Sequence, residues 1–136
     1  MSELGGPTLE QVSGAIRASW SADTCDPTDQ ATWSPDNPSR GQCGTTSLVL
    51  HDYFGGDLMF AEVLYADGTK QGHHYWNVLP DGTELDLTGD QFLPHEVLQP
   101  GRLVVRPPGR PKRCGQEYAL LRRRVAATLA GSEPAS

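Results

Sequence analysis

The sequence predicts a single domain of the α+β class. Its 136 residues match the usual length of one domain, about 100–150 residues. Apolar residues recur at helical spacing near both ends of the chain, which predicts helices there. The central segments are apolar, partly aromatic and separated by turn sequences, which predicts short strands. We therefore expect one domain over residues 1–136, with residues 1–6 and 131–136 flexible.

Three segments are predicted to be helices. The first covers residues 8–20, where a capping-box pattern precedes apolar residues at helical spacing. The second begins near Cys43 and ends at Phe54, because the two glycines that follow are a stop signal. The third covers residues 117–129, where leucine and valine again recur at helical spacing.

Strands are expected at residues 58–65, 74–79, 83–88 and 102–106. The segment before the second helix, residues 21–41, is rich in aspartate, proline, serine and threonine, and its prolines forbid a long helix. A loop of this length in a small domain is usually either functional or disordered.

The turn between the second and third strands allows two registers. A three-residue loop at residues 80–82 pairs position 76 with 86, so that His74 and Asp86 share a face about 5–8 Å apart. A two-residue turn at 81–82 pairs position 77 with 86 and places Asp86 on the face opposite His74. Proline fits the first central position of a type I turn, so Pro80 favours the first register.

Cys43 lies at the predicted N-terminus of the second helix. Unsatisfied N–H groups and the helix dipole favour an anion at this position. They therefore favour the thiolate form of a cysteine there, and they can also stabilise a developing oxyanion. One location could thus supply both a nucleophile and an oxyanion hole, unless Cys43 is a small buried residue that packs the helix start.

An imidazole that is oriented by a carboxylate and lies near such a thiol has the logic of a Cys-His-Asp nucleophilic site. We therefore predict Cys43 as the nucleophile, His74 as the base and Asp86 as the residue that orients the imidazole. Both residues also have a purely structural interpretation. His74 could be a polar residue at a strand end that bonds to a backbone carbonyl, and Asp86 could serve a turn or a salt bridge.

Charge and cysteine content exclude several classes of function. A net charge of −6 argues against a general nucleic-acid binder. No apolar run approaches the roughly 18 residues of a membrane span.

An odd number of cysteines and a polar N-terminus without a secretory pattern favour a reducing cytoplasm. The basic C-terminal region, including residues 122–124, is expected to pack on the acidic body or to be solvated, with an anion or partner site as the alternative.

No metal or cofactor is predicted. Residues of the right ligand types are present: Cys25, Cys43, Cys114, His73 and His74. They lack the paired spacing that structural zinc sites usually show. The aspartates of the segment 21–41 also lack the spacing and the bidentate glutamate of an EF-hand.

Four motifs together resemble the YunG family of small bacterial proteins, over roughly residues 8–125. They are Pro38 to Gly44, Tyr53 to Gly56, His74 to Asn77 and Asp81 to Phe92. The order of a helix-start cysteine, a strand histidine and an aspartate on the next strand also resembles papain-like and transglutaminase-like cysteine enzymes. The resemblance implies a papain-like core, in which a Cys-bearing helix packs on a small antiparallel sheet. It also supports the assigned roles of Cys43, His74 and Asp86, and it makes Gln42 a candidate oxyanion donor.

We expect a cysteine hydrolase or acyltransferase that forms an acyl-enzyme from an amide, ester or thioester. The substrate is expected to be a small molecule or a peptide end, because a chain of this size leaves no second lobe for a deep groove. The candidate oxyanion and substrate-binding residues are Gly41, Gln42, Trp33, Trp76 and Asn77. Trp33 would close the groove from the segment 21–41. The alternative is a non-catalytic binding module with an aromatic groove.

Overall fold

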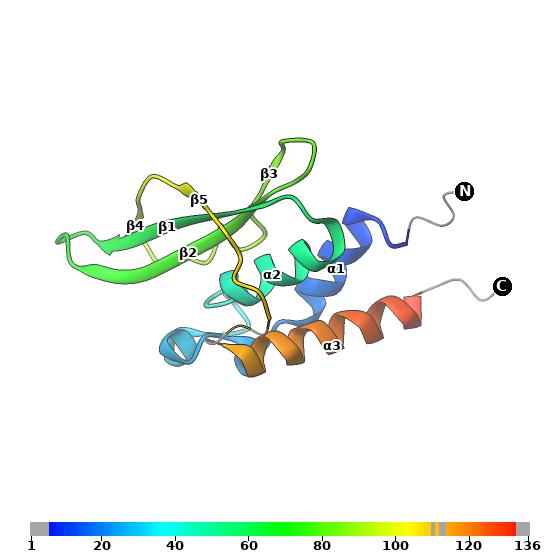
Figure 1. Ribbon diagram of the computed structural model, residues 1–136. Helices are drawn as coiled ribbons and strands as arrows, with labels where there is room; N and C mark the ends of the chain where they lie inside the picture. The colour runs from blue at the N-terminus through cyan, green and yellow to red at the C-terminus, as the bar shows by residue number, and fades with distance from the viewer. Residues whose placement is uncertain (1–5, 110, 112–113, 133–136) are drawn as a thin grey trace.

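The computed structural model describes residues 6–109, 111 and 114–132, and these form an α+β domain (Figure 1). The elements in chain order are α1 (Leu9–Ser19), η2 (Ala22–Thr24), η3 (Pro27–Thr32), α2 (Cys43–Phe54), β1 (Asp57–Tyr65), β2 (Lys70–Val78), β3 (Glu84–Leu85), β4 (Glu96–Leu98), β5 (Arg102–Val104) and α3 (Gly115–Ser132). The predicted class is therefore confirmed. The expected flexible ends fall largely on residues 1–5 and 133–136, which lie outside the described residues, whereas residues 131 and 132 belong to α3.

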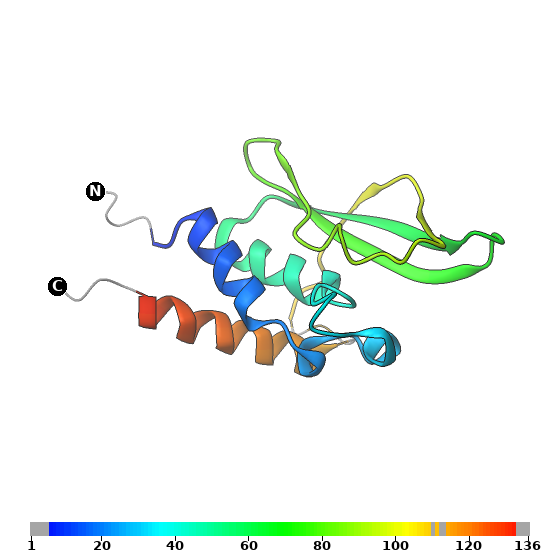
Figure 2. The same ribbon diagram turned by 180° about the vertical axis from the view of Figure 1, so that it is seen from behind.

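Helix α2 lies between the sheet and α3, and α1 packs along α3 (Figures 1 and 2). Helix α1 begins with the predicted capping box between Thr8 and Gln11. The buried apolar core joins the three helices with the loop after β3, through Val12, Ala15, Ile16, Val49, Leu50, Leu87, Tyr118, Leu121 and Val125. No helix in the described part of the chain is long and apolar enough to cross a bilayer.

The sheet is antiparallel and has the order β3-β2-β1-β4, with β5 also paired to β1. Strand β4 pairs with the end of β1 and β5 with its beginning, so both lie on the same edge of that strand. The structure shortens the predicted strand 102–106 to 102–104, and it adds β4, which the sequence analysis did not predict. Three residues are too few to show the alternation by which a strand is recognised.

The hairpin between β2 and β3 adopts the predicted three-residue loop. Val78 pairs with Glu84, and the N–H of Leu79 donates to the carbonyl of Thr83 at 2.8 Å. Strand β3 ends at Leu85 rather than continuing to residue 88 as predicted. The chain therefore leaves the sheet just before Asp86, on the face that His74 occupies.

The basic C-terminal region packs on the acidic body, as expected from its charge. Arg124 donates to the carbonyl of Ser19 at 3.2 Å and to the hydroxyl of Ser21 at 2.8 Å. Arg122 lies 3.8 Å from a carboxylate oxygen of Asp52. These contacts attach α3 to the first half of the chain, so they explain part of the charge asymmetry without a separate anion site.

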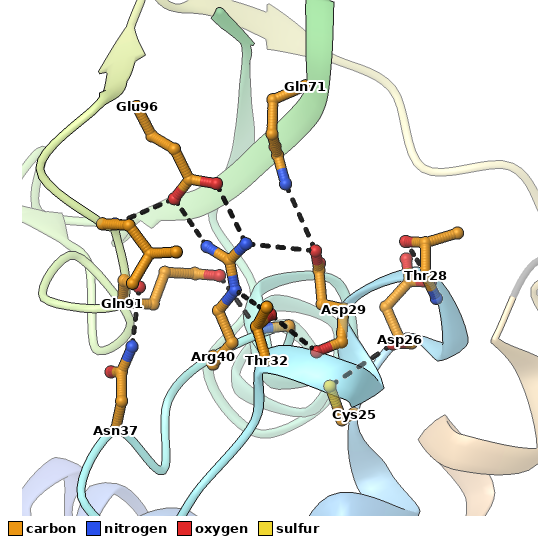
Figure 3. A network of polar contacts seen from close by, with 12 residues as sticks. Cys25, Asp26, Thr28, Asp29, Thr32, Asn37, Arg40, Gln71, Gln91 and Glu96 are labelled. Carbon is orange, nitrogen blue, oxygen red and sulfur yellow. Dashed lines mark hydrogen bonds and ion pairs between the residues drawn. The ribbon is translucent and has the colours of Figure 1, made fainter. Parts of the chain in front are cut away.

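A buried ion-pair network fixes the segment 21–41 against the sheet (Figure 3). Arg40 forms a bidentate pair with Glu96, with N–O distances of 2.6 and 2.9 Å, and both side chains are almost fully buried. Arg40 also lies 3.5 Å from Asp29 and donates to the hydroxyl of Thr32 at 2.9 Å. This segment leads directly into α2, so the network also positions the helix start that carries Cys43.

Glu96→Gln is expected to lower the free energy of unfolding by about 2–3 kcal/mol, because it leaves a buried guanidinium with only Asp29 as counter-charge. Burial raises the pKa of Glu96, but hydrogen bonds from Arg40 and from the Leu93 N–H outweigh it and hold that pKa below its usual value. The stabilisation is therefore present above the pKa of the unfolded carboxyl and is lost as the pH falls through the lower folded value. Urea unfolding between neutral and acidic pH measures both effects.

The matched control is Glu62→Gln, which breaks the exposed pair between Glu62 and Lys70, 3.3 Å apart with side chains 50% and 54% exposed. It should change the unfolding free energy by less than about 1 kcal/mol. If Glu96→Gln and Glu62→Gln lowered the unfolding free energy equally, the Arg40 network would not anchor the segment 21–41.

Candidate functional site

His74 and Asp86 form the centre of the site. His74 is fully buried on β2, and its Nε2 lies 2.6 Å from Oδ2 of Asp86. The other carboxylate oxygen accepts hydrogen bonds from the N–H and the hydroxyl of Thr88, at 3.2 and 3.3 Å. The carboxylate is therefore fixed from both sides. Because a carboxylate can only accept, Nε2 carries a proton and donates it to Asp86.

Two aromatic rings hold the imidazole of His74 in place. Trp76 stacks beside it at 5.4 Å between ring centroids, and Phe92 meets it edge-on at 4.8 Å. The indole N–H of Trp76 donates to Glu84 at 2.9 Å, which fixes that ring in turn. Gln91, which the sequence analysis did not single out, places its side-chain nitrogen 3.5 Å from Nδ1 of His74.

The pKa of His74 rises to about 9 although burial alone lowers it. The pKa is raised by the hydrogen bond to Asp86, by the hydrogen bond with the Cys43 side chain and by the charges of both groups. The structure therefore brings the three predicted catalytic side chains into one interacting group. The imidazolium form of His74 persists through neutral pH.

Cys43 is the first residue of α2 and is half-buried. Its sulfur lies 3.9 Å from the carbonyl oxygen of His73, at the edge of β2. Gln42, the N-cap, makes no side-chain capping hydrogen bond to the described helix. The first N–H groups of α2 are consequently not occupied by a side-chain cap and are available beside the sulfur.

Gly41 allows the chain to turn sharply into α2. Its φ of +71° is disfavoured for residues with a Cβ, and a Cβ here would lie 2.4 Å from the sulfur of Cys25. Its N–H donates to the side-chain oxygen of Gln91 at 3.0 Å. Gln91 therefore links the residues that precede Cys43 to the surroundings of His74.

The structure places two predicted binding residues, Gln42 and Asn77, in supporting roles. The Gln42 side chain is fully buried and bonded at both ends to the η2 turn, to the Ser21 carbonyl at 3.0 Å and to the Thr24 hydroxyl at 2.7 Å. It is therefore turned away from Cys43 and is not available as the expected oxyanion donor. Asn77 is buried and donates to the Ser47 carbonyl at 3.0 Å, which ties β2 to α2.

The two predicted tryptophan contacts also differ from expectation. The indole N–H of Trp33 donates to the Pro38 carbonyl at 2.9 Å, so Trp33 anchors its own loop rather than closing a groove. Trp76 packs on His74, and a Cβ on Gly101 would lie 2.5 Å from its ring. A tryptophan can anchor a loop, pack against an imidazole or contact a ligand, so the residue type alone did not distinguish these roles.

A cavity of about 900 Å³ opens beside Cys43. Its floor holds Gly41, Cys43 and Gly44, and its wall holds Phe60 and Tyr75. Charged groups also line it, with Asp26 and Asp29 from the segment 21–41 and Arg102 from β5. Phe60 and Tyr75 could have been found from the hairpin register, because they are cross-strand partners. Arg102 could not, because β5 joins β1 over a long sequence separation.

Cys25 differs from Cys43 in its surroundings, whereas Cys114 lines the same cavity as Cys43. Burial, reinforced by the nearby charges of Asp29 and Asp26, raises the pKa of the Cys25 thiol to about 12. Cys25 is therefore an unreactive thiol at neutral pH. Across the residues described, no group of three or more histidine, cysteine or acidic side chains is arranged to hold a metal ion.

Comparison with known proteins identifies one family. A family model described as YunG protein matches residues 8–130. A Bacillus subtilis (strain 168) protein described as "Uncharacterized protein YunG" is 32% identical over 84 residues, which are 62% of this chain and 63% of the relative. The chain thus matches somewhat less than two thirds of that relative's length. No solved structure matches the chain significantly.

Proposed function

Since this chain belongs to the YunG family, we propose for it the chemistry that its own candidate site supports, a cysteine-dependent acyl transfer. Cys43 is the nucleophile, His74 the acid and base, and Asp86 the group that orients His74. The observation that carries the proposal is the 2.6 Å bond between His74 and Asp86, on an imidazole whose pKa the Cys43 side chain also raises.

The reaction begins with the sulfur of Cys43 attacking the carbonyl carbon of an amide, ester or thioester. A carbon–sulfur bond forms, and the first N–H groups of α2 stabilise the negative charge on the oxygen. The bond to the leaving group then breaks, and the imidazolium of His74 gives that group its Nδ1 proton. The product of this step is an acyl-enzyme on Cys43.

The second half of the reaction uses the same imidazole as a base. Once Cys43 is acylated, its thiol no longer raises the pKa of His74, while the hydrogen bond to Asp86 remains. The neutral imidazole takes a proton from water or an amine, which attacks the acyl carbon and releases Cys43. Hydrolysis and transfer to an amine therefore require the same residues.

A papain-like arrangement is part of this proposal. It is supported by the packing of the Cys-bearing helix α2 against β2, the strand that carries His74. A small-molecule or peptide-end substrate is supported by the cavity size, since pockets for small ligands are usually about 300–1,000 Å³. A cytoplasmic location is supported by the three free thiols, which are typical of a reducing compartment.

Intact-mass measurement tests the proposal directly. The protein is incubated with N-acetylcysteamine thioesters of acetic, butyric, benzoic and phenylacetic acid. At least one should add a single acyl group, and peptide mapping should place it on Cys43, because this sulfur lies beside both His74 and the cavity. Acylation of Cys25 should be absent because that thiol is buried and protonated.

Cys43→Ala is the control for this experiment and should take up no acyl group. Two results together would contradict the proposal: no acylation of Cys43 by any donor, and iodoacetamide labelling of Cys43 at pH 6 no faster than that of an unstructured cysteine peptide. The chain would then be better described as a binding module that uses the same cavity.

A further inference from the structure

We propose that the cavity beside Cys43 selects an acyl donor whose acyl group is aromatic and carries an anionic group at its far end. This inference rests on the proposed function for the acyl chemistry, but the ligand class follows from the cavity itself. An aromatic wall would hold the ring, and the Arg102 guanidinium would hold the anion.

The aromatic wall is built by a cross-strand pair and its neighbour. Phe60 on β1 is paired with Tyr75 on β2, and their ring centroids are 5.2 Å apart. His73 lies 5.0 Å from the same phenyl ring. All three line the cavity, and Phe60 and Tyr75 are only half-buried. The partly open rings can therefore pack against a further aromatic group edge-on or offset.

Arg102 supplies a cation at the edge of this wall. It is the β5 partner of Phe60, and its guanidinium carbon lies 4.8 Å above the phenyl centroid. It is exposed, and among the residues that the structure describes no carboxylate pairs with it. A guanidinium in this state has donors for a bidentate hydrogen bond to a carboxylate or phosphate.

Arg106, which also lines the cavity, already uses its donors for hydrogen bonds within the protein. Arg106 donates to Asp52 at 2.9 Å, to the Tyr118 hydroxyl at 3.2 Å and to the Leu48 carbonyl at 3.4 Å. Its role is to attach the segment after β5 to α2 and α3. Among the cavity-lining residues that the structure describes, Arg102 is therefore the arginine whose donors remain for a ligand.

The positions of the groups set the orientation and the length of the ligand. Cys43 contacts β2 at His73, whereas the backbone of Arg102 on β5 lies two strands from that of β2, which at about 4.8 Å per strand is about 10 Å. A phenyl ring between an acyl carbon and an anionic group spans such a gap. The carboxylates of Asp26 and Asp29 also line the cavity, and because they would repel an anion, the anionic group of the ligand would turn toward Arg102.

Binding of unreactive ligands tests the ligand class without any chemistry at Cys43. We expect 4-ethylbenzoate to bind the wild-type protein at least about tenfold more tightly than neutral 4-ethylbenzyl alcohol, measured by NMR titration, because only the anion pairs with Arg102. It should also bind more tightly than 4-ethylcyclohexanecarboxylate, which lacks the aromatic face. Arg102→Gln should abolish the preference for the anion, and Arg102→Lys should restore part of it.

Arg17→Gln, on the exposed face of α1, is the charge-matched control and should leave both affinities unchanged. Equal binding of the anion and the alcohol, or an unchanged preference in Arg102→Gln, would overturn the inference. So would tighter binding of the cyclohexane analogue.

An acylation experiment separates this inference from the proposed function. The N-acetylcysteamine thioester of 4-carboxyphenylacetic acid should acylate Cys43 about tenfold faster than that of phenylacetic acid, and Arg102→Gln should remove the difference. Acylation at equal rates in both proteins would overturn the inference and leave the proposed function standing. Arg102-dependent binding with no acylation of Cys43 would support the ligand class and contradict the acyl chemistry.

Discussion

In the His74→Gln variant, alkylation of Cys43 by iodoacetamide at pH 6 is expected to slow about 100-fold. An ordinary thiol with a pKa near 8.5 is only about 0.3% ionised at that pH, whereas a neighbouring imidazolium favours the thiolate form of a cysteine. The loss is smaller than the change in thiolate fraction, because a less acidic thiol gives a more nucleophilic thiolate. The rate is followed by intact mass, with peptide mapping to separate Cys43 from Cys114.

The alkylation rate of Cys43 should depend on pH through the charge of His74. The pKa of His74 is raised to about 9, so the imidazolium is present below that pH and is lost as the pH rises through it. Wild-type labelling should therefore stay near a plateau from pH 6 to pH 8, whereas in His74→Gln it should rise about tenfold per pH unit below the thiol pKa.

His95→Gln is the matched control, because His95 is exposed and stacks on Tyr65 at the far end of β1. It should reproduce the wild-type profile. Since His74 is fully buried, a circular dichroism melt must show that His74→Gln is folded. A folded variant with the wild-type plateau would mean that His74 does not hold the charge opposite Cys43.

Asp86→Asn is expected to slow the release of acyl groups from Cys43 by about 10³-fold, measured as turnover of the best thioester donor. Loss of the equivalent carboxylate in a serine protease triad costs about 10⁴-fold, because the imidazole adopts the wrong tautomer. Here the carboxylate also raises the pKa of His74 through its hydrogen bond. The upper limit of the labelling plateau should therefore move below pH 9 in this variant.

The fold should survive this substitution, because the Asp86 side chain is 29% exposed and asparagine keeps an oxygen for Thr88. Asp81→Asn, in the exposed hairpin turn, preserves the acceptor for the Thr83 N–H and should leave turnover unchanged. If Asp86→Asn turned over the donor at the wild-type rate, Asp86 would be a turn residue only, as the simplest interpretation of the sequence allows.

The arrangement of the proposed catalytic trio, Cys43, His74 and Asp86, was predictable because the position of each member depends on local chain geometry. Pro80 selects the hairpin loop, and that register places Asp86 on the face of His74. The glycines around Cys43 and the stop after Phe54 mark the ends of α2. Such features are encoded within a few residues, so they are readable without knowledge of the rest of the chain.

The surroundings of the trio were not predictable, because they depend on partners far away in the sequence. Arg40 meets Glu96 across 56 positions, and Gln91 reaches the N–H of Gly41 across 50. Asn77 and Gln42 are polar residues near the site whose bonds run to Ser47 and Ser21. Only the three-dimensional arrangement shows that these amides hold the framework and do not face the cavity.

The packing of α1 along α3 has a consequence for how the protein is made. The β1–β2 hairpin can close as soon as its two strands have left the ribosome, because its contacts are local. Val12 and Ile16, in contrast, belong to the same core cluster as Leu121 and Val125 of α3, which are synthesised much later. The side of the first helix that packs on α3 must therefore stay uncovered during synthesis until α3 has left the ribosome.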